Sequence, residues 1–126
     1  MQKYTNKDNQ IAVLYSPGYG AGWYTENTRR PDCLFHPELV ELVMKKEELD
    51  DNFDGVNMTN EAFYGECRKI TAQVVAKAKE LFGEEFCTYG ADQLSIEWMV
   101  PGQCFRMREY DGSESIEYAE GEWLTA

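Results

Sequence analysis

The sequence predicts an α+β fold in which an antiparallel sheet of about four strands carries two helices on one face. Three observations predict it: a short apolar run near the N-terminus, two amphipathic stretches in the middle, and alternating apolar and polar residues in the last third. The strand–helix–strand repeat of a parallel sheet is missing from this order. A chain of 126 residues suits one domain, covering positions 1–126.

Local signals place the strands. The first apolar run is short and continuous, whereas the later strands alternate and are separated by a Pro-Gly turn and an Asp-Gly turn. Asp-Gly between two such runs is a strong hairpin signal. We expect strands at 11–14, 94–100, 104–110 and 115–118, and leave open a short final strand near 122–125.

Capping residues place the two helices. The first is expected over 37–48, because proline is favoured at the first helical position and Pro37 precedes an apolar stripe. The second is expected to begin after an N-cap at Thr59 and to run to about Phe82. Gly83 is placed to end it in a left-handed conformation.

The charge of the chain limits the kinds of partner. The 23 acidic and 12 basic residues give a net charge of -11, which disfavours direct contact with a nucleic-acid backbone. Three interpretations stay open: solubility alone, docking on a basic partner, or metal binding. No apolar stretch approaches the ~20 residues of a membrane span, so we expect no membrane segment. The polar N-terminal segment lacks a signal-peptide pattern, so a cytoplasmic protein is expected.

The sequence contains few candidate catalytic residues. The four cysteines are at least 17 residues apart, without a Cys-x-x-Cys motif, and are expected to be reduced structural thiols. His36 is the single histidine, and its place before Pro37 suggests capping or exposure. A zinc site with two histidines is therefore impossible, and a Ser-His-Asp set would depend on His36. We expect no enzyme, and assign no catalytic residue, metal ion or cofactor.

A glycine-rich aromatic segment, 15–24, follows the first strand. Three glycines alternate with large rings, which suits either a structural loop or a recognition surface. A phosphate loop is disfavoured, because neither a helix nor a lysine follows at once. In a ligand pocket, a ring would stack on a base and a nearby arginine would pair with an anionic group. The candidate contact residues are Gly18, Tyr19, Gly20, Gly22, Trp23, Tyr24, Arg29 and Arg30.

An acidic connector between the predicted helices matches the calcium-loop pattern. Its oxygen-bearing positions are Asp50, Asn52, Asp54 and Glu61. Asn57 replaces the usual aliphatic residue of such a loop, and no second loop of this kind follows. Both a solvated connector and a calcium site stay open. As partner contacts, the candidates here are Asp50, Asp51 and Asp54.

Both ends of the chain carry a resemblance. The segments 14–23, 96–116 and 122–126 resemble a group of small acidic proteins encoded by bacteriophages and prophages, for which no activity is established. This resemblance implies a protein that binds and blocks host machinery or a bacterial-defence factor in the host cytoplasm.

Together these features favour a non-enzymatic phage-type accessory protein that inhibits a host or defence protein through an acidic, aromatic-bearing surface. The alternative is a small-ligand binder that sequesters a nucleotide signal, and a third is calcium binding by the acidic connector. The oligomeric state is left open.

Overall fold

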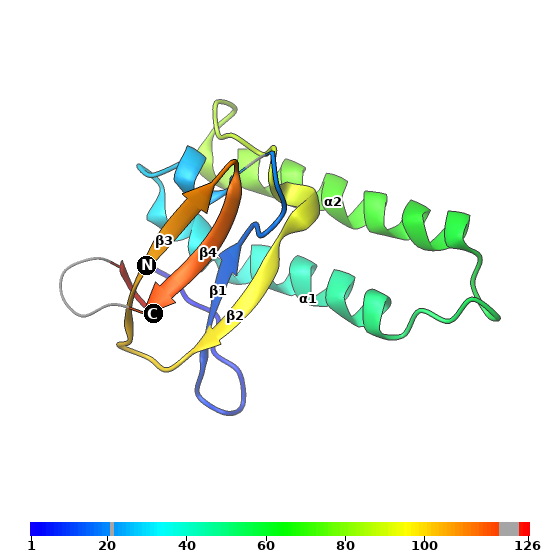
Figure 1. The fold of residues 1–126 in the computed structure, drawn as a ribbon, viewed down its shortest axis with the longest axis horizontal. Coiled ribbons are helices and arrows are strands. Elements are labelled where there is room, and N and C mark those ends of the chain that lie inside the picture. Colours follow the sequence, from blue (N-terminus) through cyan, green and yellow to red (C-terminus); the bar gives the residue numbers. More distant parts are fainter. Residues whose placement is uncertain (21, 119–123) are drawn as a thin grey trace.

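The computed structural model describes residues 1–20, 22–118 and 124–126. It confirms the α+β class, with two helices and five strands in the described ranges, but the strands form two separate antiparallel sheets rather than one sheet of about four (Figure 1). The strands are β1 (Ile11–Tyr15), β2 (Ser95–Met99), β3 (Cys104–Tyr110), β4 (Ser113–Tyr118) and β5 (Leu124–Thr125). The helices are α1 (Pro37–Asp51) and α2 (Asn60–Phe82), with 3-10 turns η1 (Tyr24–Glu26), η2 (Pro31–Leu34) and η3 (Ala91–Gln93).

Strand pairing explains the two sheets. Among the described strands β1 pairs with β2, in a register that sets Val13 opposite Glu97, and Ile11 forms an isolated bridge with Thr5. β3 lies between β4 and β5 in the second sheet. The β3–β4 hairpin turns at Asp111 and Gly112, both with positive φ (51° and 84°), as a two-residue turn of the predicted Asp-Gly type requires.

The helix ends largely follow the predicted caps. Nδ1 of His36 accepts a hydrogen bond from the Glu38 amide at 3.2 Å, which confirms its capping role. Oγ1 of Thr59 caps α2 in the same way. α1 runs on to Asp51 instead of ending at 48. Gly83 ends α2 with a φ of 107°, but its ψ of 159° is extended, which corrects the expected left-handed helical conformation.

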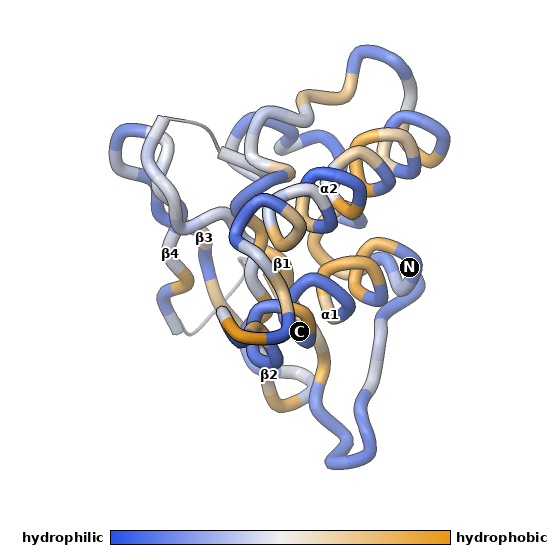
Figure 2. Tube along the Cα trace, turned by 90° about the vertical axis from the view of Figure 1, so that its right-hand side faces the viewer, coloured by the Kyte–Doolittle hydropathy of each residue, from blue (hydrophilic) through white to orange (hydrophobic). Residues whose placement is uncertain are grey.

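β1 is buried on both faces. Ala12 and Leu14 pack against the two helices, whereas Ile11 and Val13 belong to a second cluster under the β3–β4–β5 sheet. Figure 2 shows the hydrophobic parts of α1 and α2 turned into the molecule and the hydrophilic loops at its edge. Double-sided burial explains why this strand is a continuous apolar run, since each fully buried aliphatic side chain contributes about 1.5–3 kcal/mol.

Across the described ranges, no helix combines the length and the apolar character needed to cross a bilayer.

Candidate functional site

A buried carboxylate holds the glycine-rich segment in place. The side chain of Glu114 on β4 is only 1% exposed. Its Oε1 accepts the Ser16 amide at 2.9 Å, and its Oε2 accepts the amides of Trp23 and Thr25 at 2.9 and 2.8 Å and the Thr25 hydroxyl at 2.8 Å. Burying a charged group is costly unless it is hydrogen-bonded, and here both oxygens are. We call this arrangement the Glu114 clamp.

Further hydrogen bonds hold the loop against the β3–β4 hairpin. The Gly20 amide donates to the carbonyl of Asp111 at 2.7 Å, and the Ser113 hydroxyl donates to the carbonyl of Pro17 at 2.6 Å. Gly20 makes its bond with a φ of 95°, a value that glycine adopts without strain. The end of β1 is thereby joined to the start of β4, so the loop connects the two sheets.

Close packing requires a glycine beside the clamp. A Cβ at Gly22 would overlap Oγ1 of Thr25, which is one of the groups bound to the Glu114 carboxylate. Gly18 lies directly against the side chain of Gln93. The sequence pattern of alternating glycines therefore serves the packing of this loop.

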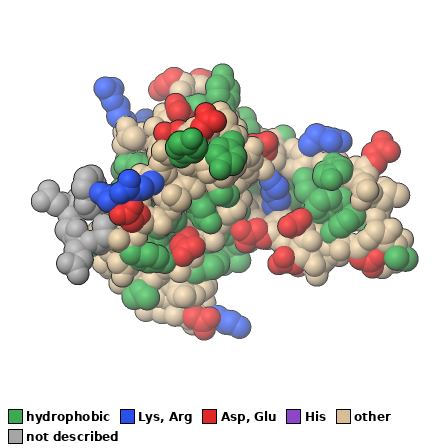
Figure 3. All heavy atoms as spheres, in the orientation of Figure 1, with side chains coloured by type: hydrophobic (Ala, Val, Ile, Leu, Met, Phe, Trp, Pro, Cys, Tyr) green, Lys and Arg blue, Asp and Glu red, His purple; other side chains and the backbone are tan. Residues whose placement is uncertain are grey.

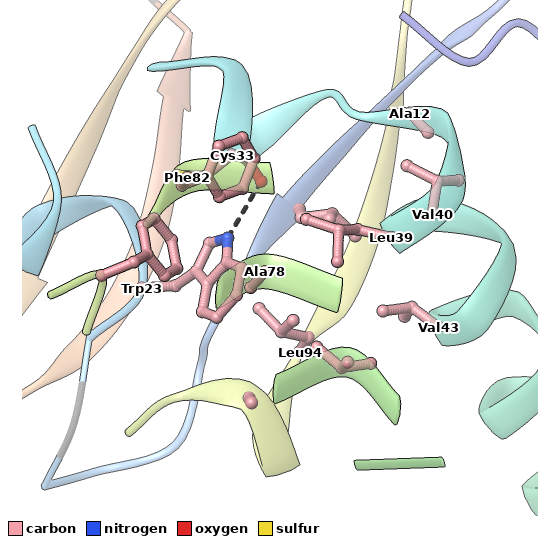
Figure 4. Packing of buried hydrophobic residues seen from close by; sticks show 13 residues of the cluster. Ala12, Trp23, Cys33, Leu39, Val40, Val43, Ala78, Phe82 and Leu94 are labelled. Carbon is pink, nitrogen blue, oxygen red and sulfur yellow. Dashed lines mark hydrogen bonds between the residues drawn. The ribbon is translucent and has the colours of Figure 1, made fainter. Parts of the chain in front are cut away.

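Trp23 belongs to the core. Its indole is 0% exposed, donates from Nε1 to the Cys33 carbonyl at 2.9 Å and meets Phe86 edge-on, with ring centroids 5.0 Å apart (Figure 4). This corrects the expectation that the Trp23 ring is presented to a partner. Tyr24 is also half-buried, and this burial raises the pKa of its hydroxyl.

Three exposed tyrosines lie on the clamped loop or on segments that contact it. Tyr19, Tyr89 and Tyr110 are 69%, 81% and 78% exposed. Tyr19 precedes Gly20 and Tyr110 precedes Asp111, so the Gly20–Asp111 hydrogen bond brings their segments together. We call these three residues the tyrosine rim.

The segment of Tyr89 also contacts the loop. A Cβ at Gly90, the next residue, would come within 2.6 Å of the Gly22 carbonyl oxygen, so the two backbones touch. Acidic residues accompany the rings, because Glu109 and Asp111 flank Tyr110 in the hairpin. Figure 3 shows hydrophobic and acidic side chains gathered over this part of the molecule.

An acidic groove lies on α1, beside β2. Its volume is about 550 Å³. The rings of Tyr4 and Trp98 line it with centroids 5.9 Å apart, and Lys45 is its single basic residue among those described. Its carboxylates are Glu41, Glu47, Glu48 and Asp51. Burial raises the pKa of Glu47, and the nearby charges of Asp51 and Asp50 raise it further.

The acidic connector does not gather its carboxylates. Asp50 and Asp51 lie in the last turn of α1, whereas Asp54 lies in the loop, where its carboxylate bonds to the nearby residues Val56 and Asn57. Its carboxylate accepts the Val56 amide at 2.6 Å and the Asn57 side-chain amide at 2.6 Å. Within the described ranges, no group of three or more His, Cys, Asp or Glu side chains could hold a metal ion.

The two arginines predicted to pair with an anionic ligand lie apart from the glycine-rich loop. Arg29 and Arg30 line a hollow of about 520 Å³ together with Phe82 and Phe86. Tyr19 does not line this hollow. The structure therefore brings the glycine loop to the Asp111–Gly112 turn and leaves the two arginines on a separate surface, so the expected pairing of these rings and arginines in one ligand pocket is not formed.

Glu114 is the central residue that sequence reasoning missed. It sits between two serines just after a turn, where a solvated carboxylate is the ordinary expectation. Its partners are 89 to 98 residues away in the chain, so local pattern carries no signal of its burial.

Fold and site together define an α+β domain in which a loop between two small sheets is fixed on a buried carboxylate. No protein-family profile, no curated protein and no solved structure matches the chain.

Proposed function

We propose that this protein is a non-enzymatic binding module that docks on a basic face of another protein through the tyrosine rim and the acidic groove. The observation that carries the proposal is the exposure of three tyrosines on segments fixed around the Glu114 clamp. Tyrosine is enriched at protein interfaces, where its ring supplies apolar area and its hydroxyl a hydrogen bond.

Pre-ordering supports this role. A partner that bound a flexible loop would have to order it, which costs free energy for each immobilised residue. Here the bonds of Glu114 to Ser16, Trp23 and Thr25 already order the backbone beside Tyr19. More of the contact energy is then available for affinity.

Charge supports a basic partner. The net charge of -11 steers basic proteins towards the molecule, and the acidic groove contains four carboxylates beside one lysine. The front face in Figure 3 carries acidic side chains over the region where Figure 1 places α1. Binding is expected to weaken as the salt concentration rises, because salt screens exposed charges.

Two side chains that could take part in catalysis, those of His36 and Cys33, have structural roles instead. His36 caps α1 through Nδ1. Burial raises the pKa of the Cys33 thiol, with the nearby charge of Glu114 adding to the effect, and a protonated thiol is a poor nucleophile.

The resemblance to phage-encoded proteins suggests the class of partner. We propose a host or bacterial-defence protein, bound and inhibited in the host cytoplasm. Inhibition would follow if the docked domain covers a basic functional surface of that protein.

A comparative capture experiment tests the proposal. The wild-type protein, the rim variant Tyr19→Ser/Tyr89→Ser/Tyr110→Ser and the control Tyr64→Ser, an exposed tyrosine on α2, are used as bait in bacterial lysates. A genuine partner is captured by wild type and control, and in purified form it binds the rim variant at least about tenfold more weakly. Equal affinity for all three baits would contradict the proposal.

A further inference from the structure

We infer that the hollow beside Arg29 and Arg30 is a second site, separate from the proposed docking surface, which binds a small phosphate-bearing ligand of the nucleotide class. Its volume of about 520 Å³ falls within the range of small-molecule sites. It lies where the segment between η1 and η2 meets the C-terminal end of α2.

The segment that carries the arginines is braced on both sides. The Asn27 side-chain amide donates to the carbonyls of Trp23 and Cys87 at 2.7 and 2.9 Å, and its oxygen accepts the Cys87 amide at 2.9 Å. The Arg30 amide in turn donates to the Asn27 carbonyl at 2.8 Å. The backbone beneath both arginines is therefore fixed, which is a condition for a formed site.

Both guanidinium groups are available for an anion. Arg29 and Arg30 are exposed, and within the described part of the chain neither forms a hydrogen bond or an ion pair through its side chain. This holds although Glu26 and Glu85 line the same hollow. A planar guanidinium matches the geometry of phosphate oxygens, so two arginines that line one hollow suit a phosphate group.

The other lining residues indicate what the phosphate is attached to. Phe82 and Phe86 line the hollow although they are only 3% and 5% exposed, so they form a narrow apolar floor, which favours a ligand with a small flat apolar part. Glu26 and Glu85 can accept hydrogen bonds from the amino groups of a base, and their charges disfavour a polyanion. A mononucleotide combines these three features, whereas inorganic phosphate would use the arginines alone.

Calorimetry with defined probes tests this inference. GMP, AMP and inorganic phosphate are titrated into the wild-type protein, Arg29→Gln, Arg30→Gln and the control Arg68→Gln, whose arginine lies on α2 outside the hollow. We expect a nucleotide to bind more tightly than phosphate, and each hollow variant to raise its Kd at least about tenfold. The control should leave the Kd unchanged, and thermal unfolding should show that all variants stay folded.

Three results would overturn the inference. They are no nucleotide binding up to about 10 mM, equal affinity for nucleotide and phosphate, or an unchanged Kd in both hollow variants. None of them bears on the tyrosine rim, so this test and the capture experiment fail independently.

Discussion

The clamped loop after β1 and the connector between the helices are both glycine-containing loops, but different interactions hold them. The loop is bound by Glu114 through partners 89 to 98 residues away. The connector is bound by Asp54, whose partners are two and three residues away. A carboxylate organises each segment, yet only the first is tied to the core.

This difference bears on recognition. A loop tied to distant strands keeps its shape as long as the domain is folded, whereas a locally bonded loop can open by itself. Tyr19 therefore stands on a fixed backbone, while Val56 at the tip of the connector is exposed without such support. Fixed segments lose less entropy on binding, which favours the clamped loop as a contact surface.

The largest expected effect contrasts an apolar side chain in each loop. Trp23→Ala should lower the free energy of unfolding by about 4–6 kcal/mol, because it leaves a cavity and removes the bond to the Cys33 carbonyl. Val56→Ala, in the connector, should change it by less than about 0.5 kcal/mol. Urea unfolding measures both free energies. A Trp23→Ala protein as stable as Val56→Ala would contradict the expected difference between the two loops.

Removing the two carboxylates compares the loops directly. Glu114→Ala should cost roughly 3–5 kcal/mol, since it leaves the buried amides of Ser16 and Trp23 and the part-buried amide and hydroxyl of Thr25 without their acceptor. Asp54→Ala should cost far less, because water can replace the lost acceptor of an exposed residue. If the two variants unfolded at the same urea concentration, Glu114 would not be the anchor of its loop.

A smaller effect is expected from adding a methyl group to each loop. Gly22→Ala should destabilise by about 1–3 kcal/mol, because the new Cβ overlaps Thr25 Oγ1. Gly55→Ala meets no atom within 4 Å and should be neutral or slightly stabilising. Midpoints of thermal unfolding distinguish these outcomes, and a neutral Gly22→Ala would mean that the clamp tolerates a looser loop.

The smallest effect concerns the pH dependence of the connector. Backbone hydrogen bonds from Val56 and Asn57 lower the pKa of Asp54. A lowered pKa in the folded state gives stability that is present above the unfolded pKa of about 3.9 and is lost as the pH falls. The Tm difference between wild type and Asp54→Ala should therefore shrink between about pH 6 and pH 3. A difference that is constant over this range would exclude ionised Asp54 as its cause.

The features of the fold that depend on neighbouring residues could be predicted from the sequence. Periodicity located both helices, and Pro37 and Thr59 marked their first turns within a residue. The Asp-Gly turn located the hairpin, since its positive φ values are a property of those residue types. These features depend on neighbours in the chain.

The long-range part could not be predicted. The described strands form two sheets because β1 pairs with β2 and not with β3, β4 or β5, and strand pairing is decided by packing across the whole domain. A tryptophan in a glycine-rich loop can lie on the surface or in the core. Trp23 lies in the core because it contacts Cys33 and Phe86, and these contacts cannot be read from the neighbouring sequence. The burial of Glu114 could not be predicted for the same reason, since its four hydrogen-bond donors come from one segment that is distant in the chain.

Hydrogen exchange of individual amides tests the central claim most directly. The Glu114 clamp predicts that the amides of Ser16, Trp23 and Thr25 exchange as slowly as those of the core, and that Glu114→Ala releases them. The Asn57 amide serves as the internal reference for a locally bonded loop. If the three clamp amides exchange as fast as Asn57 in the wild-type protein, the loop is not held by Glu114 and the account fails.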